Sequence, residues 1–365
     1  MKPETFVYLA IAAALSVLFA IVSYASNNQW SQGRATGEKL LPALATDAGQ
    51  IAAIEVRQGE TTVTLEKTGG SWVVKDRGGY PVDFAKVRTL LVALVEAELT
   101  EPKTKRPDRY AVLELEDPAD KAAKSRLVRL KDGRGGTIGE VVIGKQRQEA
   151  LSTGKPGTYV RKPGDPQTWL ANTELHASLS TKDWMKTNVL SLDAGKISRI
   201  SIEIPGEQVL KIERETPPPA KDAKDAKDGK DAKEATDPPP PGKLRFVGFP
   251  PEGKKLKDAG AAESLARAAA SIDMEDVRKL ASPPAGAGVS VVKIETAEGP
   301  TTTLHLRKDG DSHWLAVTAT GEGEAKKAAD EIVRRTQGWE YKLPAAKADA
   351  ILKRRNDLLE APPPG

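Results

Sequence analysis

The sequence contains no cysteine, although it runs to 365 residues. This absence excludes disulfide bonds, zinc sites built on thiolates and thiol nucleophiles together. A chain without cysteine is compatible with either side of a bacterial membrane, so this absence does not indicate the compartment. Aromatic residues are also scarce, at 5%, and hydrophobic residues reach 39%. These proportions predict modest hydrophobic cores and a good deal of exposed loop.

The sequence also lacks a strong excess of either charge. Lys and Arg number 55 against 51 Asp and Glu, and the formal net charge of +4 is spread along the chain. Nucleic-acid-binding domains concentrate their basic residues on one face or arm. We therefore expect no nucleic-acid partner. The length predicts about two domains of roughly 150 residues each.

One long apolar run is present, from Phe6 to Ala25, and it contains neither a charge nor a proline. A helix of about this length rises about 1.5 Å per residue and spans about 30 Å, the thickness of a bilayer's hydrocarbon. We therefore predict a transmembrane anchor within residues 1–26, preceded by a short cytoplasmic tail. A cleaved signal peptide is the alternative, because Ser23 and Ala25 occupy the two positions that signal peptidase reads.

The charges on either side of this run oppose one another. Lys2 is offset by Glu4, and Arg34 and Lys39 follow on the other flank. Because a short tail before a single span commonly stays in the cytoplasm, we place the chain from about residue 30 onward outside the cytoplasm.

A sheet pattern recurs three times after residues 27–49, which we interpret as a polar tether. The first copy, residues 51–74, alternates apolar and polar side chains and reverses at glycines. Related phrases begin at Ile197 and at Val289. Alternation bounded by glycines predicts short antiparallel strands joined by tight turns.

Helical spacing follows the first copy. Asp83 has the side chain of an N-cap, and apolar residues recur every three or four positions from Phe84 to Leu99. A second helical pattern runs from Ala261 to Leu280 after the second copy. We predict an α+β fold in which two related modules, residues 50–195 and 196–360, each combine an antiparallel hairpin sheet with covering helices.

The second module is interrupted by residues 216–242, which are rich in Pro, Lys, Asp and Ala. This segment contains no apolar residue larger than alanine. It therefore cannot bury enough surface to offset the entropy of ordering. We predict a disordered loop.

The polar clusters of the sequence do not form a recognisable catalytic or ligand-binding motif. Residues 139–146 carry the letters of a phosphate-binding loop, but Gln146 cannot supply the hydroxyl that binds magnesium, and residues 140–143 alternate as a strand. No Gly-x-Ser-x-Gly elbow is present. The three histidines have no further ligands at metal-site spacing; they are His176, His305 and His313. We therefore predict no catalytic, cofactor-binding or metal-binding residues and no enzyme activity.

Five tryptophans could line a carbohydrate groove: Trp72, Trp169, Trp184, Trp314 and Trp339. Their recurrence at similar places in the modules favours core packing over a ligand platform. A platform for glycan or lipid is the alternative hypothesis. The acidic stretch that contains Glu114, Glu116 and Asp117 is expected to be a solvated loop.

Several short sequence motifs together make this chain resemble a bacterial family, the domain of unknown function numbered 4340. The resemblance rests on their order and spacing over most of residues 50–345: Ile197-x-x-Ile200, Gly70-Ser71-Trp72, Ile143-Gly144, Tyr159-Val160-Arg161 and Tyr341-Lys-Leu-Pro344. This sequence departs from the family pattern where residues 216–242 split the second copy and where Phe246 replaces a tryptophan.

The resemblance implies single-span bacterial proteins associated with auxiliary ABC transporters of the gliding-motility type. It implies no known activity and no catalytic residues. We therefore expect a non-catalytic accessory or scaffold protein of the bacterial inner membrane, with most of the chain in the periplasm and ABC transporter subunits as partners. The alternative is a cell-envelope protein that binds a glycan or a lipid.

Overall fold

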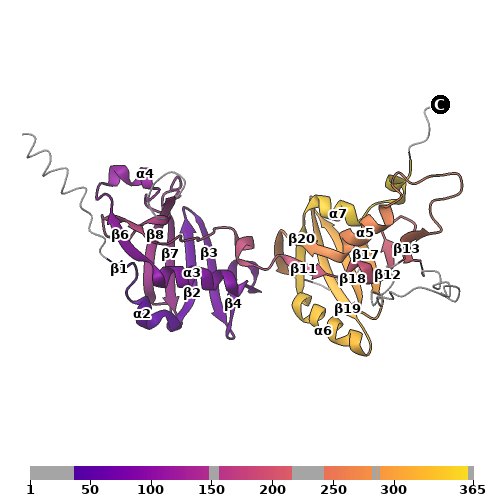
Figure 1. Ribbon diagram of the computed structural model, residues 1–365, viewed down its shortest axis with the longest axis horizontal. Coiled ribbons are helices and arrows are strands. Elements are labelled where there is room, and N and C mark those ends of the chain that lie inside the picture. The colour runs from indigo at the N-terminus through magenta and orange to yellow at the C-terminus, as the bar shows by residue number, and fades with distance from the viewer. Residues whose placement is uncertain (1–36, 148–155, 216–241, 282–285, 287, 361–365) are drawn as a thin grey trace, which may run out of the picture. The chain divides into compact units, whose positions relative to one another are not determined.

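The computed structural model describes residues 37–147, 156–215, 242–281, 286 and 288–360. The chain divides into two compact units that meet between Met185 and Lys186. Among the described residues, 41% are in strands and 25% in helices. Each unit is built mainly from antiparallel strands (Figure 1).

The first unit holds a ten-stranded antiparallel sheet in the order β1-β6-β10-β9-β8-β7-β2-β3-β4-β5. Its strands are β1 (Glu38–Lys39), β2 (Ile51–Gln58), β3 (Thr61–Thr68), β4 (Ser71–Val74), β5 (Tyr80–Pro81), β6 (Glu98–Pro102), β7 (Arg126–Asp132), β8 (Thr137–Arg147), β9 (Gly157–Arg161) and β10 (Thr168–Ala171). Its helices are α2 (Leu44–Asp47), α3 (Phe84–Glu96), α4 (Tyr110–Leu113) and the 3-10 helices η1 (Ala48–Gln50), η2 (Lys75–Arg77), η3 (Pro107–Arg109) and η5 (Thr181–Trp184).

The core of the first unit lies between one face of this sheet and α3. Apolar residues alternate along β2 and β7, so that Ile54 pairs with Leu130 and Val56 with Val128. All four side chains are fully buried. The alternate residues on these strands turn to the other face, as the period of two along a strand requires.

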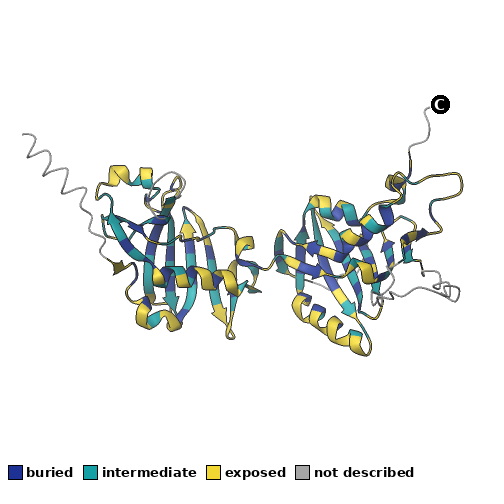
Figure 2. Cartoon of the chain, viewed as in Figure 1, coloured by how far each residue is buried: buried dark blue, intermediate teal, exposed yellow. Residues whose placement is uncertain are grey.

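Helix α3 covers this face because its buried residues recur at helical spacing. Val87, Leu90 and Leu94 are buried, and the carboxylate of Asp83 accepts a hydrogen bond from the backbone N–H of Ala85. The predicted N-cap is therefore confirmed, and so is the helix as far as Glu96, whereas Leu99 lies on β6. Phe84 was expected on the same buried stripe, but 55% of its surface is exposed. The outward side of α3 is largely exposed in Figure 2.

The second unit contains an eight-stranded sheet in the order β14-β13-β12-β17-β18-β19-β20-β16 and a separate pair, β11-β15. Its strands are β11 (Asn188–Ser191), β12 (Ile197–Glu203), β13 (Leu210–Arg214), β14 (Leu244–Val247), β15 (Ser271–Asp273), β16 (Asp276–Lys279), β17 (Val289–Thr296), β18 (Thr301–Asp309), β19 (Ser312–Thr320) and β20 (Trp339–Leu343). Its helices are α5 (Ala261–Ala270), α6 (Glu324–Thr336), α7 (Ala345–Ile351) and the 3-10 helices η6 (Ala194–Lys196) and η7 (Arg355–Leu358).

The two units share one strand order. The run β10-β9-β8-β7-β2-β3-β4 in the first unit corresponds to β20-β19-β18-β17-β12-β13-β14 in the second. A helix follows the last strand of this run in each unit: α3 comes after β4 and the short β5, and α5 comes after β14. The strand β6 pairs with both β1 and β10, and its counterpart is split into β15, which pairs with β11, and β16, which pairs with β20.

The correspondence extends to the register of the central pair. The pairing of β2 with β7 shifts between Ile51 and Ala53, and the pairing of β12 with β17 shifts between Ile197 and Arg199. Each of these strands follows a 3-10 helix, and the chain entering them reads Asp-Ala-Gly-Gln-Ile at 47–51 and Asp-Ala-Gly-Lys-Ile at 193–197. A bulge at the same place in both sheets marks it as a shared feature of the fold.

The predicted fold class is wrong. We expected an α+β protein with a transmembrane helix, whereas the described chain is mostly antiparallel sheet. None of its helices in the described ranges has both the length and the apolar composition to cross a membrane. The predicted span, Phe6 to Ala25, and residues 216–241 of the predicted loop lie outside the described residues.

Two other predictions differ from the structure. The helix expected from Ala261 to Leu280 ends at Ala270, since Ile272 pairs with Leu190 and Val277 with Tyr341. The stretch 37–49, which we interpreted as part of a tether, belongs to the first unit. It forms β1, α2 and η1, and Leu40 and Leu44 are buried.

Shortening the buried face of α3 tests its place in the first core. Leu94→Ala removes a fully buried side chain, and we expect it to lower the free energy of unfolding by about 2–5 kcal/mol through lost burial and a residual cavity. Val92→Ala, two residues away, is the control, because Val92 is 43% exposed. Its expected effect is within about 0.5 kcal/mol in urea denaturation. Equal losses for both variants would contradict the orientation of α3.

Candidate functional site

A cavity of about 830 Å³ opens in the first unit beside α3. One wall is α3 itself, which contributes Thr89, Leu90 and Ala93. The opposite walls are the far half of β8, from Ile143 to Gln146, and the segment 174–178 that follows β10. The volume lies within the range of about 300–1,000 Å³ typical of ligand-binding pockets.

The floor of the cavity is apolar and its rim carries both charges. Leu90, Ile143 and Leu175 are aliphatic lining residues. Four basic side chains also line the space: Lys86, Lys124, Arg126 and Lys145. Three acidic ones accompany them: Glu114, Glu174 and Asp183. An apolar floor with a charged rim suits a ligand that is itself amphipathic.

The rim side chains are held by contacts within the unit. The Arg126 guanidinium donates to the backbone carbonyl of Ala177 at 2.9 Å, and the Lys86 ammonium donates to that of Met185 at 3.3 Å. The Ser178 hydroxyl donates to the Asp183 carboxylate at 2.6 Å, and the Trp184 indole N–H donates to the Ser178 carbonyl at 2.9 Å. These bonds fix the segment after β10 as one wall of the cavity.

His176 is the histidine that lies at this cavity. Its Nδ1 is 3.1 Å from Nε2 of Gln146, and its Nε2 is 3.3 Å from a Glu174 carboxylate oxygen. Sequence reasoning found no partner for it, because Gln146 lies on β8, 30 residues away along the chain. Both ring nitrogens are engaged by these two contacts, so His176 links β8 to the segment 174–178.

Close backbone packing shapes the β8 wall. A Cβ on Gly144 would collide with the carbonyl oxygen of Leu113 and lie 2.8 Å from that of Glu114. Glu114 itself has a φ of 57°, in the left-handed region that non-glycine residues rarely adopt. The stretch that ends α4 therefore sits directly against β8, and only glycine fits at position 144. The letters of a phosphate-binding loop at residues 139–146 lie within the strand β8, as we predicted.

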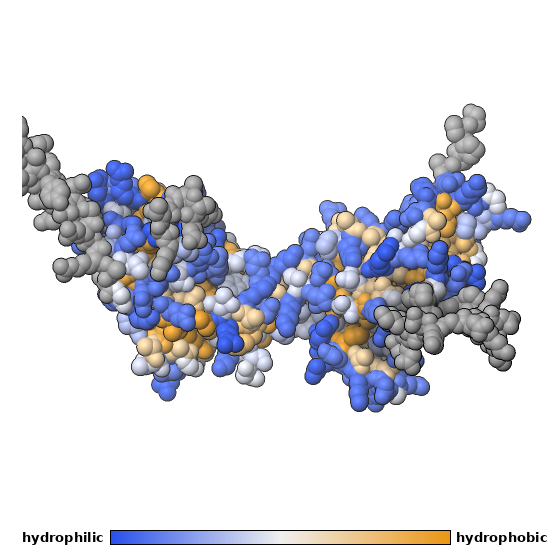
Figure 3. Space-filling model, in the orientation of Figure 1, coloured by the Kyte–Doolittle hydropathy of each residue, from blue (hydrophilic) through white to orange (hydrophobic). Residues whose placement is uncertain are grey.

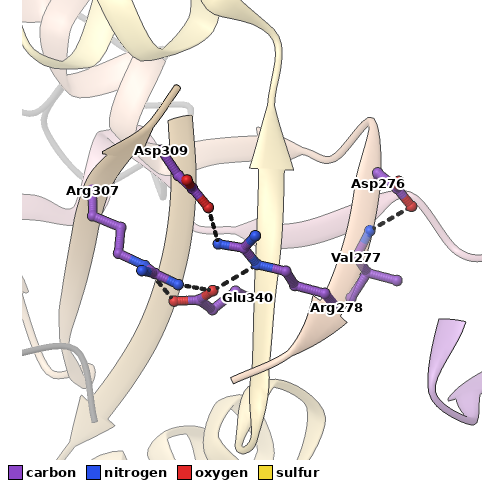
Figure 4. Close-up of polar contacts among 6 residues, drawn as sticks. All are labelled: Asp276, Val277, Arg278, Arg307, Asp309 and Glu340. Atoms are coloured by element: carbon purple, nitrogen blue, oxygen red, sulfur yellow. Dashed lines mark hydrogen bonds and ion pairs between the residues drawn. The ribbon is translucent and has the colours of Figure 1, made fainter. Parts of the chain in front are cut away.

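A second polar cluster lies on the sheet of the second unit (Figure 4). Glu340, on β20, is only 2% exposed, and its carboxylate accepts hydrogen bonds from Arg307 at 2.6 and 2.8 Å and from Arg278 at 3.0 Å. Arg278 also donates to Asp309 at 2.8 Å. Burial alone would raise the pKa of Glu340, but the bonds from Arg307 and Arg278 outweigh it and hold that pKa below its usual value near 4.5.

This cluster is structural rather than acid–base in character. Both oxygens of the Glu340 carboxylate are bonded to guanidinium groups, so neither is available to take a proton from a substrate. Arg278 lies over the ring of Trp314 at 3.7 Å from its centroid, which ties β16 to β19. The carboxylate joins three strands that are not consecutive in the sequence.

The five tryptophans of the described ranges divide between core and partly exposed positions. Trp184 is buried at 3% exposure, as core packing requires, and it lines the cavity. The other four keep part of their surface in solvent: Trp72, Trp169, Trp314 and Trp339. The prediction of a solvated acidic loop is wrong at Glu116. The Oε2 atom of Glu116 is buried and has no hydrogen-bond partner in the described structure.

The remaining histidines belong to the second unit. His305 lies on β18 with Nε2 3.3 Å from the Thr318 hydroxyl, and burial lowers its pKa. Nδ1 of His305 and Nδ1 of His313 are buried and make no hydrogen bond within the described ranges. No three His, Cys, Asp or Glu side chains in those ranges gather closely enough to hold a metal ion. The arrangement at the cavity is suited to binding.

Adding one methyl group to β8 tests the cavity wall. We expect Gly144→Ala to push the chain at Leu113 and Glu114 away from β8 and to cost about 1–3 kcal/mol of stability, because the new Cβ meets backbone that cannot rotate aside. Gly139→Ala on the same strand is the control, since its Cβ would meet only the Leu41 side chain at 3.5 Å. Urea denaturation compares the two, and an equal cost for both would contradict the close approach at Gly144.

The pH dependence of stability tests the cluster at Glu340. Because the pKa of Glu340 is lowered in the folded protein, its charge contributes stability above the unfolded pKa, and this contribution is lost as the pH falls through the folded pKa. We expect Glu340→Gln to lose about 1–3 kcal/mol at pH 7 and to show a shallower decline below about pH 4.5. Glu213→Gln is the control, since Glu213 meets an exposed Arg199. Identical acid profiles for Glu340→Gln and the parent would refute the assignment.

Comparison with known proteins gives one match. No curated protein and no solved structure matches the chain. A family model does, and the matched residues begin within β4 of the first unit and end at β14 of the second, so that they cross the junction at Met185 and cover neither unit completely. Residues 72–244 match the family described as a domain of unknown function (DUF4340).

Proposed function

We propose that this protein is a non-catalytic accessory or scaffold protein that binds a partner through its first unit, with subunits of an ABC transport system as that partner. The observation that carries the proposal is the 830 Å³ cavity, whose apolar floor and charged rim are suited to binding. The family match over residues 72–244 supports the association, because the family resemblance implies proteins found beside such transporters.

The polar clusters support binding over catalysis. At the cavity, Asp183 is bonded to Ser178, and Arg126 and Lys86 are bonded to backbone carbonyls. Side chains held in this way present a fixed surface, which lowers the entropy lost when a partner binds. The proposed location is the periplasmic side of the bacterial inner membrane, where such a partner would be reached.

A glycan or lipid ligand is the second candidate function. Trp314 favours it, because the residue retains partial solvent exposure although Arg278 lies over one face of its ring, 3.7 Å from the centroid. Aromatic rings that remain partly in solvent are suited to stacking against sugars.

Co-purification tests the proposed partnership. The tagged full-length chain is expected to recover the permease of the transporter from membranes in mild detergent, and deletion of the protein is expected to lower transport. Gly139→Ala, which alters a position away from the cavity lining, is expected to recover the permease equally well. Loss of the permease from the eluate together with normal transport after deletion would overturn the proposal. Binding of purified peptidoglycan fragments, without the permease, would support the second candidate instead.

A further inference from the structure

The end of each unit contacts the residues just before α3 or α5 in the same way. In the first unit the backbone N–H of Asp83 donates to the carbonyl of Trp184 at 2.7 Å, and Val82 bridges to Met185. In the second, Lys257 donates to Leu358 at 2.9 Å and Leu256 bridges to Leu359. Trp184 and Leu358 are the last residues of four-residue 3-10 helices, η5 in one unit and η7 in the other.

These matching contacts align the segments that follow the last strand of each sheet. In the second unit, residues 344–354 connect β20 to η7 and contain α7. Helix α7 packs against α5 and β19, and its Ala348 and Ile351 are completely buried. In the first unit, residues 172–180 connect β10 to η5 and contain no helix. Residues 174–178 of this segment line the cavity.

The helices on which these segments pack differ accordingly. Six of the ten residues of α5 are buried: Ala261, Ala262, Leu265, Ala266, Ala269 and Ala270. Three of the thirteen residues of α3 are buried, and its Thr89 and Ala93 face the cavity. Figure 3 shows hydrophobic residues gathered over α2 and α3 on the viewed face of the first unit. One side of α3 therefore lines the cavity uncovered, whereas the corresponding side of α5 is buried.

We infer that the cavity of the first unit receives a short helix from a partner protein, in the place that α7 fills in the second unit. This inference rests on the proposed function and names the partner's binding segment. The matching helix carries small and aliphatic side chains on its inner side, as Ala348 and Ile351 do in α7. It packs over Leu90, Ala93 and Ile143, in the manner of an amphipathic helix in a groove. The cavity is then completed by the partner.

A peptide copied from the chain is the probe. A fluorescent, end-capped peptide of residues 344–354, which spans α7, is titrated with the full-length protein, and binding is followed by anisotropy. Thr89→Trp places a large side chain in the cavity from a position on α3 that tolerates it, because Thr89 is exposed. We expect its Kd to rise at least about tenfold. Val92→Trp is the matched control, since Val92 is exposed on α3 and lies outside the cavity lining, and it should bind like the parent.

A second peptide and a second assay complete the test. The peptide with Ile351→Asp is expected to bind at least about tenfold more weakly, because its inner face then carries a charge. Absence of binding to the parent protein, or equal binding to Thr89→Trp and Val92→Trp, would overturn the inference. Recovery of the permease by Thr89→Trp would also overturn it, while leaving the partnership intact. Failure of the parent protein to recover the permease would instead remove the proposed function.

Discussion

The antiparallel pairing of β2 with β7, and of β12 with β17, is the interaction on which the rest of each unit depends. Each unit contains two runs of consecutive antiparallel strands, β2-β3-β4 and β7-β8-β9 in the first and β12-β13-β14 and β17-β18-β19 in the second. The pairing joins the first strands of the two runs edge to edge, so that two small sheets become one with a continuous apolar face. A sheet needs three or more strands with a hydrophobic face, or packing against a helix, to be stable. Joined, the two expose enough apolar surface for a helix to cover. The shared bulge next to Ile51 and Ile197 keeps the same residues on the buried face in both units, because a slip by one residue would turn them to solvent.

The same frame is completed differently in the two units. In the second, α7 packs on α5, and the buried carboxylate of Glu340 ties β16, β18 and β20 together through two arginines. In the first, the segment after β10 stays irregular and leaves the cavity beside α3. Duplication of this kind lets one copy keep a closed core while the other retains an open site. Function is then expected at the place where the two copies differ.

Much of the local structure could be predicted from residue pattern. The alternation in Ile51 to Val74, the N-cap at Asp83 and the strand at residues 140–143 all follow from spacing and side-chain type, and each is present. The prediction failed where a distant strand supplied the backbone partner. Residues 271–279 carry a helical pattern, yet they pair with β11 and β20. The run β7 to β9 was not recognised as a further copy, although β7 pairs with β2 as β17 pairs with β12.

The sequence by itself determined the repeated strands, the absence of thiol chemistry and the near balance of charge, because periodicity and composition are local properties of the chain. Only the tertiary structure decided that Phe84 is exposed, that Glu340 is buried between two arginines, and that Gly144 borders a cavity with His176. Each of these depends on residues that are far apart in the sequence. Packing between such residues, and the space left where a helix is missing, follows from strand order and register, which no single stretch of sequence encodes.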